Sequence, residues 1–173
     1  MEKFRPDIYQ KSIYQINYEN LKEKGIKCLL FDLDNTIIAY DRVKVSKELK
    51  ELFIHLKELK FKVIIMSNSS KRRLLKLKEQ LHVPIIYRAM KPFNINFVRV
   101  FKQYRYSQTD VAIIGDQLMT DIKGGNNVGI MTILVDPIKE SDAFITKFNR
   151  YREHRKLEKL GANGMLLKGR YYE

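Results

Sequence analysis

The sequence contains a single cysteine, Cys28, among its 173 residues. One cysteine excludes an internal disulfide and a metal site built from several thiolates. Because Cys28 lies inside an apolar run, we expect it to be a small buried core residue rather than a reactive thiol. The histidines His55, His82 and His154 are far from one another and from the acidic motifs in the sequence, so no zinc site is indicated.

Long apolar runs are also missing. No stretch approaches the roughly 18 consecutive apolar residues of a membrane span. The N-terminal residues MEKFRPDIYQK contain no apolar segment of the kind found in secretory signals. We therefore expect a cytoplasmic protein, with peripheral contact with the inner face of a membrane as an option.

Acidic residues are in deficit, because 33 Lys and Arg stand against 20 Asp and Glu, for a net charge of +13. Such an excess attracts anionic partners such as nucleic acid, ribosomes, anionic lipid or phosphorylated ligands. A well-solvated surface explains the same charge, so composition alone does not choose among these partners.

The chain instead offers short apolar runs that alternate with amphipathic segments. The runs predict five strands, at 27–34, 62–66, 85–87, 111–115 and 130–135. Helices are predicted at 8–24, 46–60, 70–81, 93–105, from about 118, and at 142–160. This alternation predicts an α/β fold, with one Rossmann-like domain over 1–160, a five-stranded parallel sheet and helices on both faces. Residues 161–173 are expected to form a loosely ordered C-terminal tail.

Polar residues that can carry chemistry follow four of the predicted strands, and sites in parallel sheets lie at that edge. Alternate carboxylates on an extended chain, as in Asp32 and Asp34, point the same way and repel each other. A divalent cation with oxygen ligands relieves this repulsion, and Mg²⁺ fits such a site. The residues concerned are Asp32, Asp34, Asn35, Thr36, Ser67, Asn68, Lys91, Asp116 and Asp121.

This set of residues suits phosphoryl transfer. A carboxylate can attack phosphorus to form an aspartyl-phosphate, while Asp34 serves as acid and base and Lys91 supplies positive charge. Ser67, Asn68 and main-chain N–H groups can bind phosphate oxygens. The alternative interpretation of DLDNT, a turn with a helix cap, leaves the residues after the other strands unexplained. Asp41 and Asp136 also lie near loop ends but do not fit the pattern.

Four motifs resemble those of the haloacid dehalogenase (HAD) superfamily, and the DxDNT form resembles its subclass IIIA phosphatases. They are DLDNT at 32–36, Ser67, the Lys91-Pro92 pair, and GDQLMTD at 115–121. The resemblance implies a nucleophile at Asp32 and a general acid/base at Asp34. It also implies that Ser67 and Lys91 bind the phosphoryl group. Mg²⁺ would be held by Asp32, the main-chain carbonyl of Asp34 and Asp116, with Asp121 supporting the metal site.

A finer resemblance connects the chain with the YqeG-type family of bacterial HAD phosphatases. It rests on the segments PDIYQKSIYQI, LKEKGIKCLLFDLDNT, MSNSS, GDQLMTDIKGGN and ITKFNR. That family is similar to the mitochondrial phosphatidylglycerophosphate phosphatases, so the resemblance implies a phosphatase with phosphatidylglycerophosphate as candidate substrate.

The spacing of the motifs leaves no room for a cap domain, because each gap from Asp34 to Ser67 and from Ser67 to Lys91 holds one helix and one strand. An open site suits a phosphate carried on something large, such as a protein, a nucleic-acid end or a lipid headgroup. Basic residues after Ser67 and in the tail suit an anionic membrane, at about 1 kcal/mol per Lys or Arg, or an RNA backbone. The alternative is that these basic residues form a solvent-exposed helix face that binds no partner. These residues are Lys71, Arg72, Arg73, Lys76, Lys78, Lys147, Arg150, Arg152, Arg155, Lys156 and Lys159, with Phe148 and Tyr151 between those of the tail.

We therefore predict a Mg²⁺-dependent phosphomonoester hydrolase that acts through an aspartyl-phosphate, with phosphatidylglycerophosphate as candidate substrate. One alternative is a phosphatase of a protein or nucleotide with the same residues. Another is an RNA- or ribosome-associated binding module with a vestigial HAD site, against which the complete set of acids argues.

Overall fold

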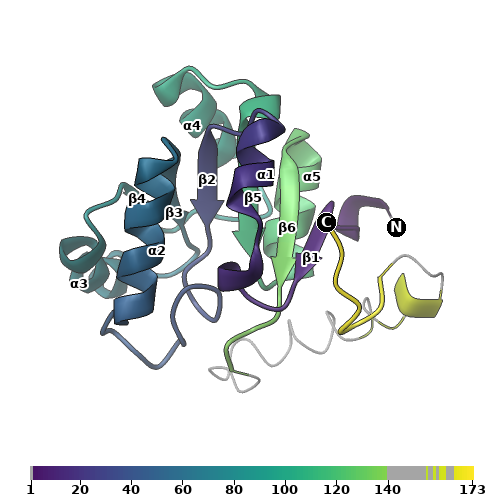
Figure 1. The fold of residues 1–173 in the computed structure, drawn as a ribbon, viewed down its shortest axis with the longest axis horizontal. Coiled ribbons are helices and arrows are strands. Elements are labelled where there is room, and N and C mark those ends of the chain that lie inside the picture. The colour runs from purple at the N-terminus through teal and green to yellow at the C-terminus, as the bar shows by residue number, and fades with distance from the viewer. Residues whose placement is uncertain (1, 140–154, 156–157, 159, 163–165) are drawn as a thin grey trace.

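A six-stranded parallel sheet forms the centre of the molecule, as a computed structural model describes it for residues 2–139, 155, 158, 160–162 and 166–173 (Figure 1). The strand order is β1-β6-β5-β2-β3-β4. From β2 the chain proceeds outward through β3 and β4, and then returns to the other side of β2 to build β5 and β6. The order of the strands therefore reverses between β2 and β5. The strands are β1 (Ile8–Gln10), β2 (Cys28–Phe31), β3 (Lys62–Met66), β4 (Ile85–Ile86), β5 (Val111–Gly115) and β6 (Met131–Val135).

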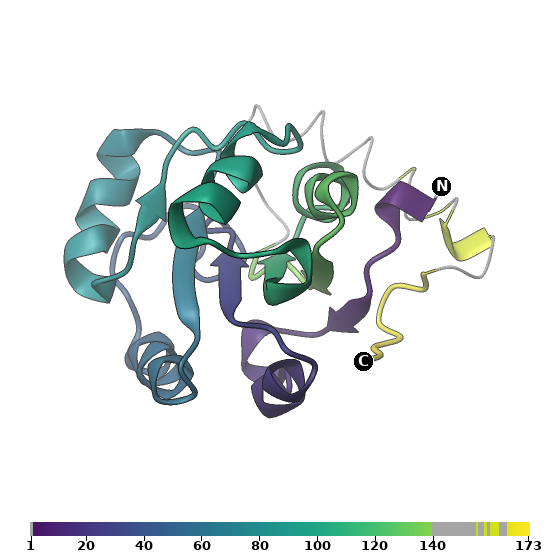
Figure 2. The ribbon, with the colours of Figure 1, turned by 90° about the horizontal axis from the view of Figure 1, so that it is seen from above.

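Helices cover both faces of the sheet. Figure 2 shows α1 and α2 on one side of the strands and α4 and α5 on the other. The buried residues of α3 belong to the same core cluster as those of α1 and α2. The helices are α1 (Tyr18–Glu23), α2 (Lys47–Glu58), α3 (Lys71–Leu81), α4 (Ile95–Tyr104) and α5 (Lys123–Val128), with shorter turns η1 (Glu2–Phe4), η2 (Ile13–Gln15), η3 (Gln108–Asp110) and η4 (Leu118–Ile122).

The continuous apolar run of β2 is explained by its central position. Leu29 and Phe31 pack in the cluster on the side of α1 to α3, while Cys28 and Leu30 pack in the cluster that contains α4. Both faces of the strand are thus buried, as expected for the middle of a parallel sheet. Cys28 is a fully buried core residue, as predicted, and burial raises the pKa of its thiol to about 12.

The predicted helix from Ser46 is confirmed by α2. The hydroxyl of Ser46 accepts a hydrogen bond from the N–H of Leu49, which caps the helix N-terminus. Leu49, Phe53 and Leu56 form its buried stripe. The helix predicted at 93–105 begins slightly later, at Ile95, so Pro92 does not occupy its first turn.

The prediction of five strands and of a helix at 8–24 was wrong in detail. Residues 8–10 form β1, which pairs with β6 in the register Ile8 to Ile133, and only Tyr18–Glu23 is α-helical in that region. The strand is three residues long and its partner is distant in the sequence. Neither periodicity nor local propensity could therefore reveal it.

The C-terminal residues add an antiparallel bridge to β1. Tyr9 donates its N–H to the carbonyl of Tyr172 and accepts the N–H of Tyr172 in return, at 2.9 and 2.8 Å. Leu160 and Leu166 are buried in the same cluster as Tyr9. Loose ordering of 161–173 stays a prediction, and the basic helix predicted at 142–160 lies largely outside the described residues. Among the described helices, none combines the length and the apolar character that crossing a bilayer requires.

Candidate active site

The strand-order reversal brings two of the predicted acids to one edge of the sheet. Asp32 follows β2 and Asp116 follows β5, and these neighbouring strands pair Phe31 with Ile114. The main-chain N–H of Asp32 continues the ladder by donating to the carbonyl of Ile114 at 2.9 Å. Sites in open parallel sheets lie in the crevice at such a reversal, and the predicted residues are found there.

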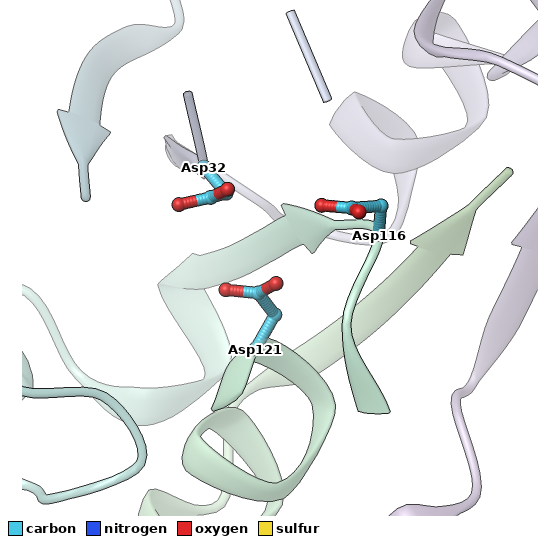
Figure 3. Close-up of side chains that lie close together, drawn as sticks. All are labelled: Asp32, Asp116 and Asp121. Carbon is cyan, nitrogen blue, oxygen red and sulfur yellow. The ribbon is translucent and has the colours of Figure 1, made fainter. Parts of the chain in front are cut away.

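A third carboxylate joins these two from the turn that follows β5. Asp32, Asp116 and Asp121 are all buried, and each offers an oxygen that lies within 4.8 Å of the others. Figure 3 shows the three carboxylates facing a common space. Gly115 allows this approach, because a Cβ at this position would lie 2.3 Å from the Cγ of Asp121.

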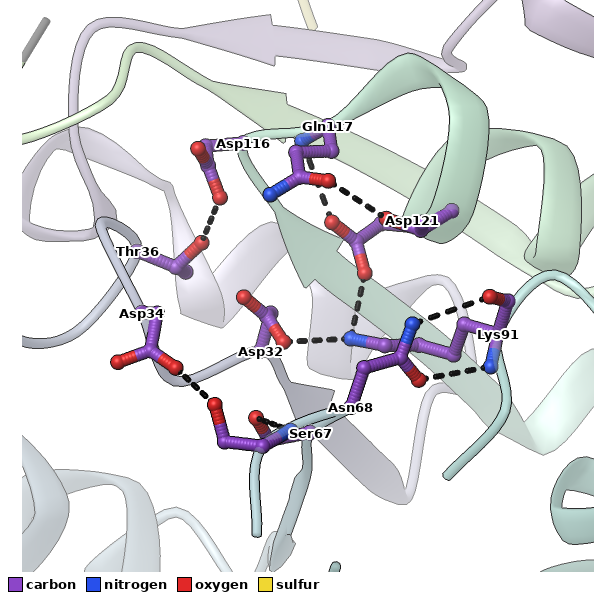
Figure 4. Close-up of polar contacts among 11 residues, drawn as sticks. Asp32, Asp34, Thr36, Ser67, Asn68, Lys91, Asp116, Gln117 and Asp121 are labelled. Atoms are coloured by element: carbon purple, nitrogen blue, oxygen red, sulfur yellow. Dashed lines mark hydrogen bonds and ion pairs between the residues drawn. The ribbon is translucent and has the colours of Figure 1, made fainter. Parts of the chain in front are cut away.

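Lys91 bridges two of the carboxylates (Figure 4). Its Nζ lies 2.6 Å from the Oδ1 of Asp32 and 2.6 Å from the Oδ1 of Asp121, and its side chain is 1 % exposed. Burial raises the pKa of Asp32 to about 7, although the Lys91 ammonium opposes this shift. Burial lowers the pKa of Lys91, but the carboxylates of Asp121 and Asp32 prevail and hold it above its ordinary value.

The loop after β3 fixes the main chain around Lys91. The side-chain amide of Asn68 donates to the carbonyl of Lys91 at 3.0 Å and accepts the N–H of Lys91 at 2.8 Å. Ser67 is buried, and its carbonyl accepts the N–H of Ala89 at 2.9 Å. Asn68 and Lys91 thus form one hydrogen-bonded unit beside Asp32, and Ser67 holds the main chain of Ala89, two residues before Lys91.

Asp34 lies next to this unit, but its carboxylate is turned towards α3. The guanidinium of Arg73 donates a hydrogen bond from Nε to Oδ1 of Asp34 at 2.8 Å and forms an ion pair with the same oxygen through Nη2 at 2.6 Å. The hydroxyl of Ser69 donates to Oδ2. The sequence identified Arg73 only as one of several basic residues and did not identify Ser69 at all. The only available signal was their position, just after Ser67.

The turn after Asp34 supports Asp116. Asn35 adopts a left-handed conformation with φ 64°, which asparagine tolerates better than most residues, and its N–H donates to the carbonyl of Ile38 at 2.8 Å. Thr36 then donates its hydroxyl to Oδ1 of Asp116 at 2.9 Å. The loop after β2 is thereby tied to the loop after β5.

The acidic cluster fits a divalent cation. The three buried carboxylates lie near one ammonium group, that of Lys91, which contacts Asp32 and Asp121. The cluster therefore carries more negative than positive charge, and burial makes that excess unfavourable. Carboxylate oxygens are the hard ligands that Mg²⁺ prefers, and they suit it better than zinc. The side chain of Asp34 is directed to Arg73 instead and does not belong to this group of three acids.

The two acids that the sequence pattern left aside lie outside this cluster. Asp41 forms an ion pair with Lys139 at 2.6 Å. Asp136 accepts hydrogen bonds from the hydroxyls of Tyr9 and Tyr171. Both acids therefore connect loops and the C-terminal residues rather than contribute to the acidic cluster.

No cap domain is inserted between the motifs. Residues 32–46, 67–70 and 87–94, which connect the strands to the helices at this edge, contain no helix and no strand longer than an isolated bridge. Within the described part of the chain, only short loops surround the acids at this edge of the sheet.

Comparisons with known sequences all lead to phosphatases of one kind. The profile of a family described as mitochondrial PGP phosphatase matches residues 1–139. Probable phosphatase YqeG from Bacillus subtilis is 44% identical over 161 residues, which cover 93% of this chain and 94% of that protein. Phosphatidylglycerophosphate phosphatase 1 from Arabidopsis thaliana is 28% identical over 148 residues, which cover 79% of this chain and 42% of that longer protein.

Solved structures of HAD hydrolases share the fold. The 3-deoxy-D-manno-octulosonate 8-phosphate phosphatase from Moraxella catarrhalis, solved with magnesium and phosphate, aligns with a TM-score of 0.51 at 19% identity, covering 70% of this chain and 75% of its own. The magnesium-bound HAD hydrolase YfnB from Bacillus subtilis aligns with a TM-score of 0.53 at 16% identity, covering 74% and 99%. At these identities the likeness concerns the fold alone.

Proposed function

The chain belongs to the PGP phosphatase family of HAD-type phosphatases, and on that basis we propose that it hydrolyses phosphatidylglycerophosphate through an aspartyl-phosphate on Asp32. The observation that carries this proposal is the environment of Asp32. Its carboxylate is buried at the strand-order reversal, held by Lys91 and faced by Asp116 and Asp121.

In the first step, a carboxylate oxygen of Asp32 attacks the phosphorus of the ester. A bond forms between that oxygen and phosphorus while the bond from phosphorus to the leaving alkoxide breaks. Asp34 donates the proton that turns the alkoxide into an alcohol. Arg73 and Ser69 hold this carboxylate next to the acidic cluster, in the loop that also carries Asp32.

In the second step, water attacks the phosphorus of the aspartyl-phosphate. Asp34, which lost its proton in the first step, accepts a proton from this water. The bond between phosphorus and the Asp32 oxygen breaks, inorganic phosphate leaves, and the Asp32 carboxylate is regenerated. The same side chain thus acts as acid and then as base, so each turnover restores the starting protonation state.

Binding of the phosphoryl group falls to Lys91, Ser67 and main-chain N–H groups of the first loop. Lys91 brings a buried positive charge into contact with the nucleophile, where the transferring group must arrive. Asn68 uses both ends of its side-chain amide on the main chain of Lys91. We therefore assign the Asn68 side chain to positioning Lys91 rather than to contact with phosphate.

The metal assigned to this site is Mg²⁺, with Asp32 and Asp116 as carboxylate ligands, the main-chain carbonyl of Asp34 as a further ligand and Asp121 in support. When bound, Mg²⁺ offsets the negative charge shared by the carboxylates and the incoming phosphate. Thr36 and Gln117 orient the acids for this purpose, through the hydroxyl bond to Asp116 and an N–H bond to Asp121 at 3.2 Å.

Phosphatidylglycerophosphate is assigned as substrate because the family profile and the Arabidopsis relative both carry that activity in their names. The short loops around the acids support it, since a lipid headgroup must reach the site while its acyl chains stay in a bilayer. This substrate places the protein at the inner face of a membrane, as a peripheral protein with a surplus of positive charge.

The test is phosphate release from phosphatidylglycerophosphate in detergent micelles, compared with a panel of soluble esters that includes phosphopeptides and nucleotides. We expect Mg²⁺-dependent release from the lipid at a higher kcat/KM than from any soluble ester. The Asp32→Asn variant should fold and release none. Preference for a phosphopeptide or nucleotide would replace the substrate assignment, and RNA binding without Mg²⁺-dependent turnover would contradict the enzymatic proposal.

A further inference from the structure

The segment from β4 into α4 exposes four large apolar side chains beside the candidate active site. Tyr87 is 44% exposed, Met90 49%, Phe93 68% and Ile95 56%. We call these four residues the apolar rim. They lie within the single segment 87–95, which also contains the buried Lys91. Solvent exposure of several large apolar side chains at one place marks an interaction surface more often than isolated exposed residues do.

Hydrogen bonds hold this segment with its apolar residues outward. Ala89 and Lys91 are buried, while Met90 between them is exposed. The N–H of Ala89 donates to Ser67 and the N–H of Phe93 donates to the carbonyl of Met90, both at 2.9 Å. Because the ammonium of Lys91 contacts Asp32 and Asp121, the apolar rim lies on the same short segment as a residue of the candidate active site.

Basic residues lie next to the apolar rim. The Nζ of Lys71, the first residue of α3, lies 5.7 Å from the centre of the Tyr87 ring. Arg72 and Arg88 are exposed as well, and the N–H of Arg88 donates to the carbonyl of Ser69 at 3.1 Å, next to the site. Positive charge and exposed apolar surface therefore occur together at the carboxyl edge of the sheet.

We propose that the apolar rim inserts into the headgroup region of an anionic bilayer, with Lys71, Arg72 and Arg88 contacting lipid phosphates. This inference rests on the proposed lipid-borne substrate and identifies the surface that meets the lipid. An interfacial surface needs apolar side chains for the acyl boundary and cations for anionic headgroups, and both are present here. A protein partner would account for the apolar side chains, but a bilayer also accounts for the net charge of +13.

The docked orientation has a consequence for catalysis. With segment 87–95 in the headgroup layer, the acids at the same sheet edge face the bilayer, and the lipid surface takes over the exclusion of water that a cap domain provides elsewhere. We therefore expect anionic vesicles to increase turnover of the lipid substrate relative to detergent micelles. They should not increase turnover of a soluble ester.

The first experiment measures vesicle binding without substrate. Vesicles of equal parts phosphatidylcholine and phosphatidylglycerol should carry the wild type upward in flotation, and pure phosphatidylcholine vesicles should not. The double variant with Met90→Ser and Phe93→Ser should bind about tenfold more weakly, since two side chains lose their apolar burial. Its turnover of p-nitrophenyl phosphate should equal that of the wild type, which also shows that the variant folds.

Ile54 provides the matched control. It is 59% exposed in the second half of α2, which runs from the site edge towards the opposite edge of the sheet. Ile54→Ser removes a comparable exposed apolar side chain and should leave vesicle binding unchanged. Equal losses in Ile54→Ser and in the double variant would overturn the assignment of the surface.

A second readout uses the absence of tryptophan from the sequence. Phe93→Trp introduces one fluorophore into the apolar rim, and Ile54→Trp introduces one at the control position. Anionic vesicles should shift the emission of Phe93→Trp to shorter wavelength and leave that of Ile54→Trp unchanged. An unshifted emission of Phe93→Trp on bound protein would contradict insertion.

The outcomes separate this inference from the proposed function. Rim-dependent vesicle binding without hydrolysis of the lipid would retain the surface and refute the substrate. Hydrolysis of the lipid in micelles, with vesicle binding insensitive to the rim variants, would retain the substrate and refute the surface. Binding to an RNA homopolymer in place of vesicles would also refute the surface.

Discussion

The guanidinium of Arg73 binds the carboxylate of Asp34, with Nε at 2.8 Å and Nη2 at 2.6 Å from the same oxygen. This pair connects the first turn of α3 to the loop after β2, on which the proposed general acid/base lies. An arginine in such a contact fixes the orientation of a carboxylate more firmly than a lysine can.

Loss of the Arg73 guanidinium should therefore impair the chemical step. We expect Arg73→Gln to lower kcat about tenfold to a hundredfold, part of the rate that a positioned acid and base contribute. KM for p-nitrophenyl phosphate should change less. Arg72→Gln removes the same charge from the neighbouring, exposed position and should leave both constants unchanged. Steady-state kinetics of the two variants checks this prediction. Equal losses of kcat in both variants would show that only the positive charge matters and not the contact with Asp34.

Gly115 should be required for the position of Asp121. Because a Cβ at Gly115 would lie 2.3 Å from the Asp121 Cγ, Gly115→Ala must displace that carboxylate and disturb its contact with Lys91. We expect weaker Mg²⁺ binding and about a tenfold or greater loss of kcat, as for misplaced catalytic groups. Gly161→Ala is the control, since its Cβ would meet nearest atoms at an ordinary 3.5 Å. Titration calorimetry with Mg²⁺ that gives wild-type affinity for Gly115→Ala would contradict this role.

Removal of the Lys91 ammonium should make the fold depend on metal. Lys91→Met leaves the buried carboxylates of Asp32 and Asp121 without the cation they share, which costs about 3 to 5 kcal/mol when one partner of a buried pair is removed. Thermal unfolding in EDTA should show this loss, and Mg²⁺ should restore more stability to the variant than to the wild type. Lys102→Ala, at an exposed position of α4, should behave as the wild type. A Lys91→Met protein as stable as wild type in EDTA would contradict the electrostatic account.

The stability of the fold should show a pH dependence that comes from Asp110, which forms an ion pair with Lys27 at the start of β2. A hydrogen bond from Lys27, helped by Ser107, lowers the pKa of Asp110 to about 2, from 3.8 in the unfolded chain. Because the folded-state pKa is the lower one, the contribution to stability is complete above 3.8 and is lost as the pH falls towards 2. Asp110→Asn should therefore unfold at a lower temperature than wild type at neutral pH, and the difference should shrink in acid. A difference that grows in acid would contradict this sign.

The central strands could be predicted because each carries its own signal. The apolar run before Asp32 is explained by burial on both faces, and the runs before Ser67 and Asp116 likewise became β3 and β5. Once parallel strands were inferred, the position of the polar residues at one edge followed from topology. The convergence of Asp32, Lys91, Asp116 and Asp121 was predictable for that reason.

Features that depend on distant pairing could not be predicted. β1 forms because Ile8–Gln10 pair with β6, whereas its sequence alone resembles an irregular helix. Arg73 could not be told from its basic neighbours Lys71 and Arg72, because only the phase of α3 decides which of them reaches Asp34. Asn68 has the residue type of a phosphate ligand, yet its amide is used by the main chain of Lys91.

The most direct test of the account asks whether Asp32 becomes phosphorylated. In Asp34→Asn, p-nitrophenyl phosphate still offers a leaving group that needs no acid, whereas hydrolysis of the aspartyl-phosphate lacks its base. Acid quench of this variant after mixing with the ester and Mg²⁺ should give a protein heavier by one phosphoryl group, mapped by peptide mass to Asp32 and absent when Asp32→Asn is added. A variant that carries no phosphoryl group, or carries it on another side chain such as Ser67, would contradict the account.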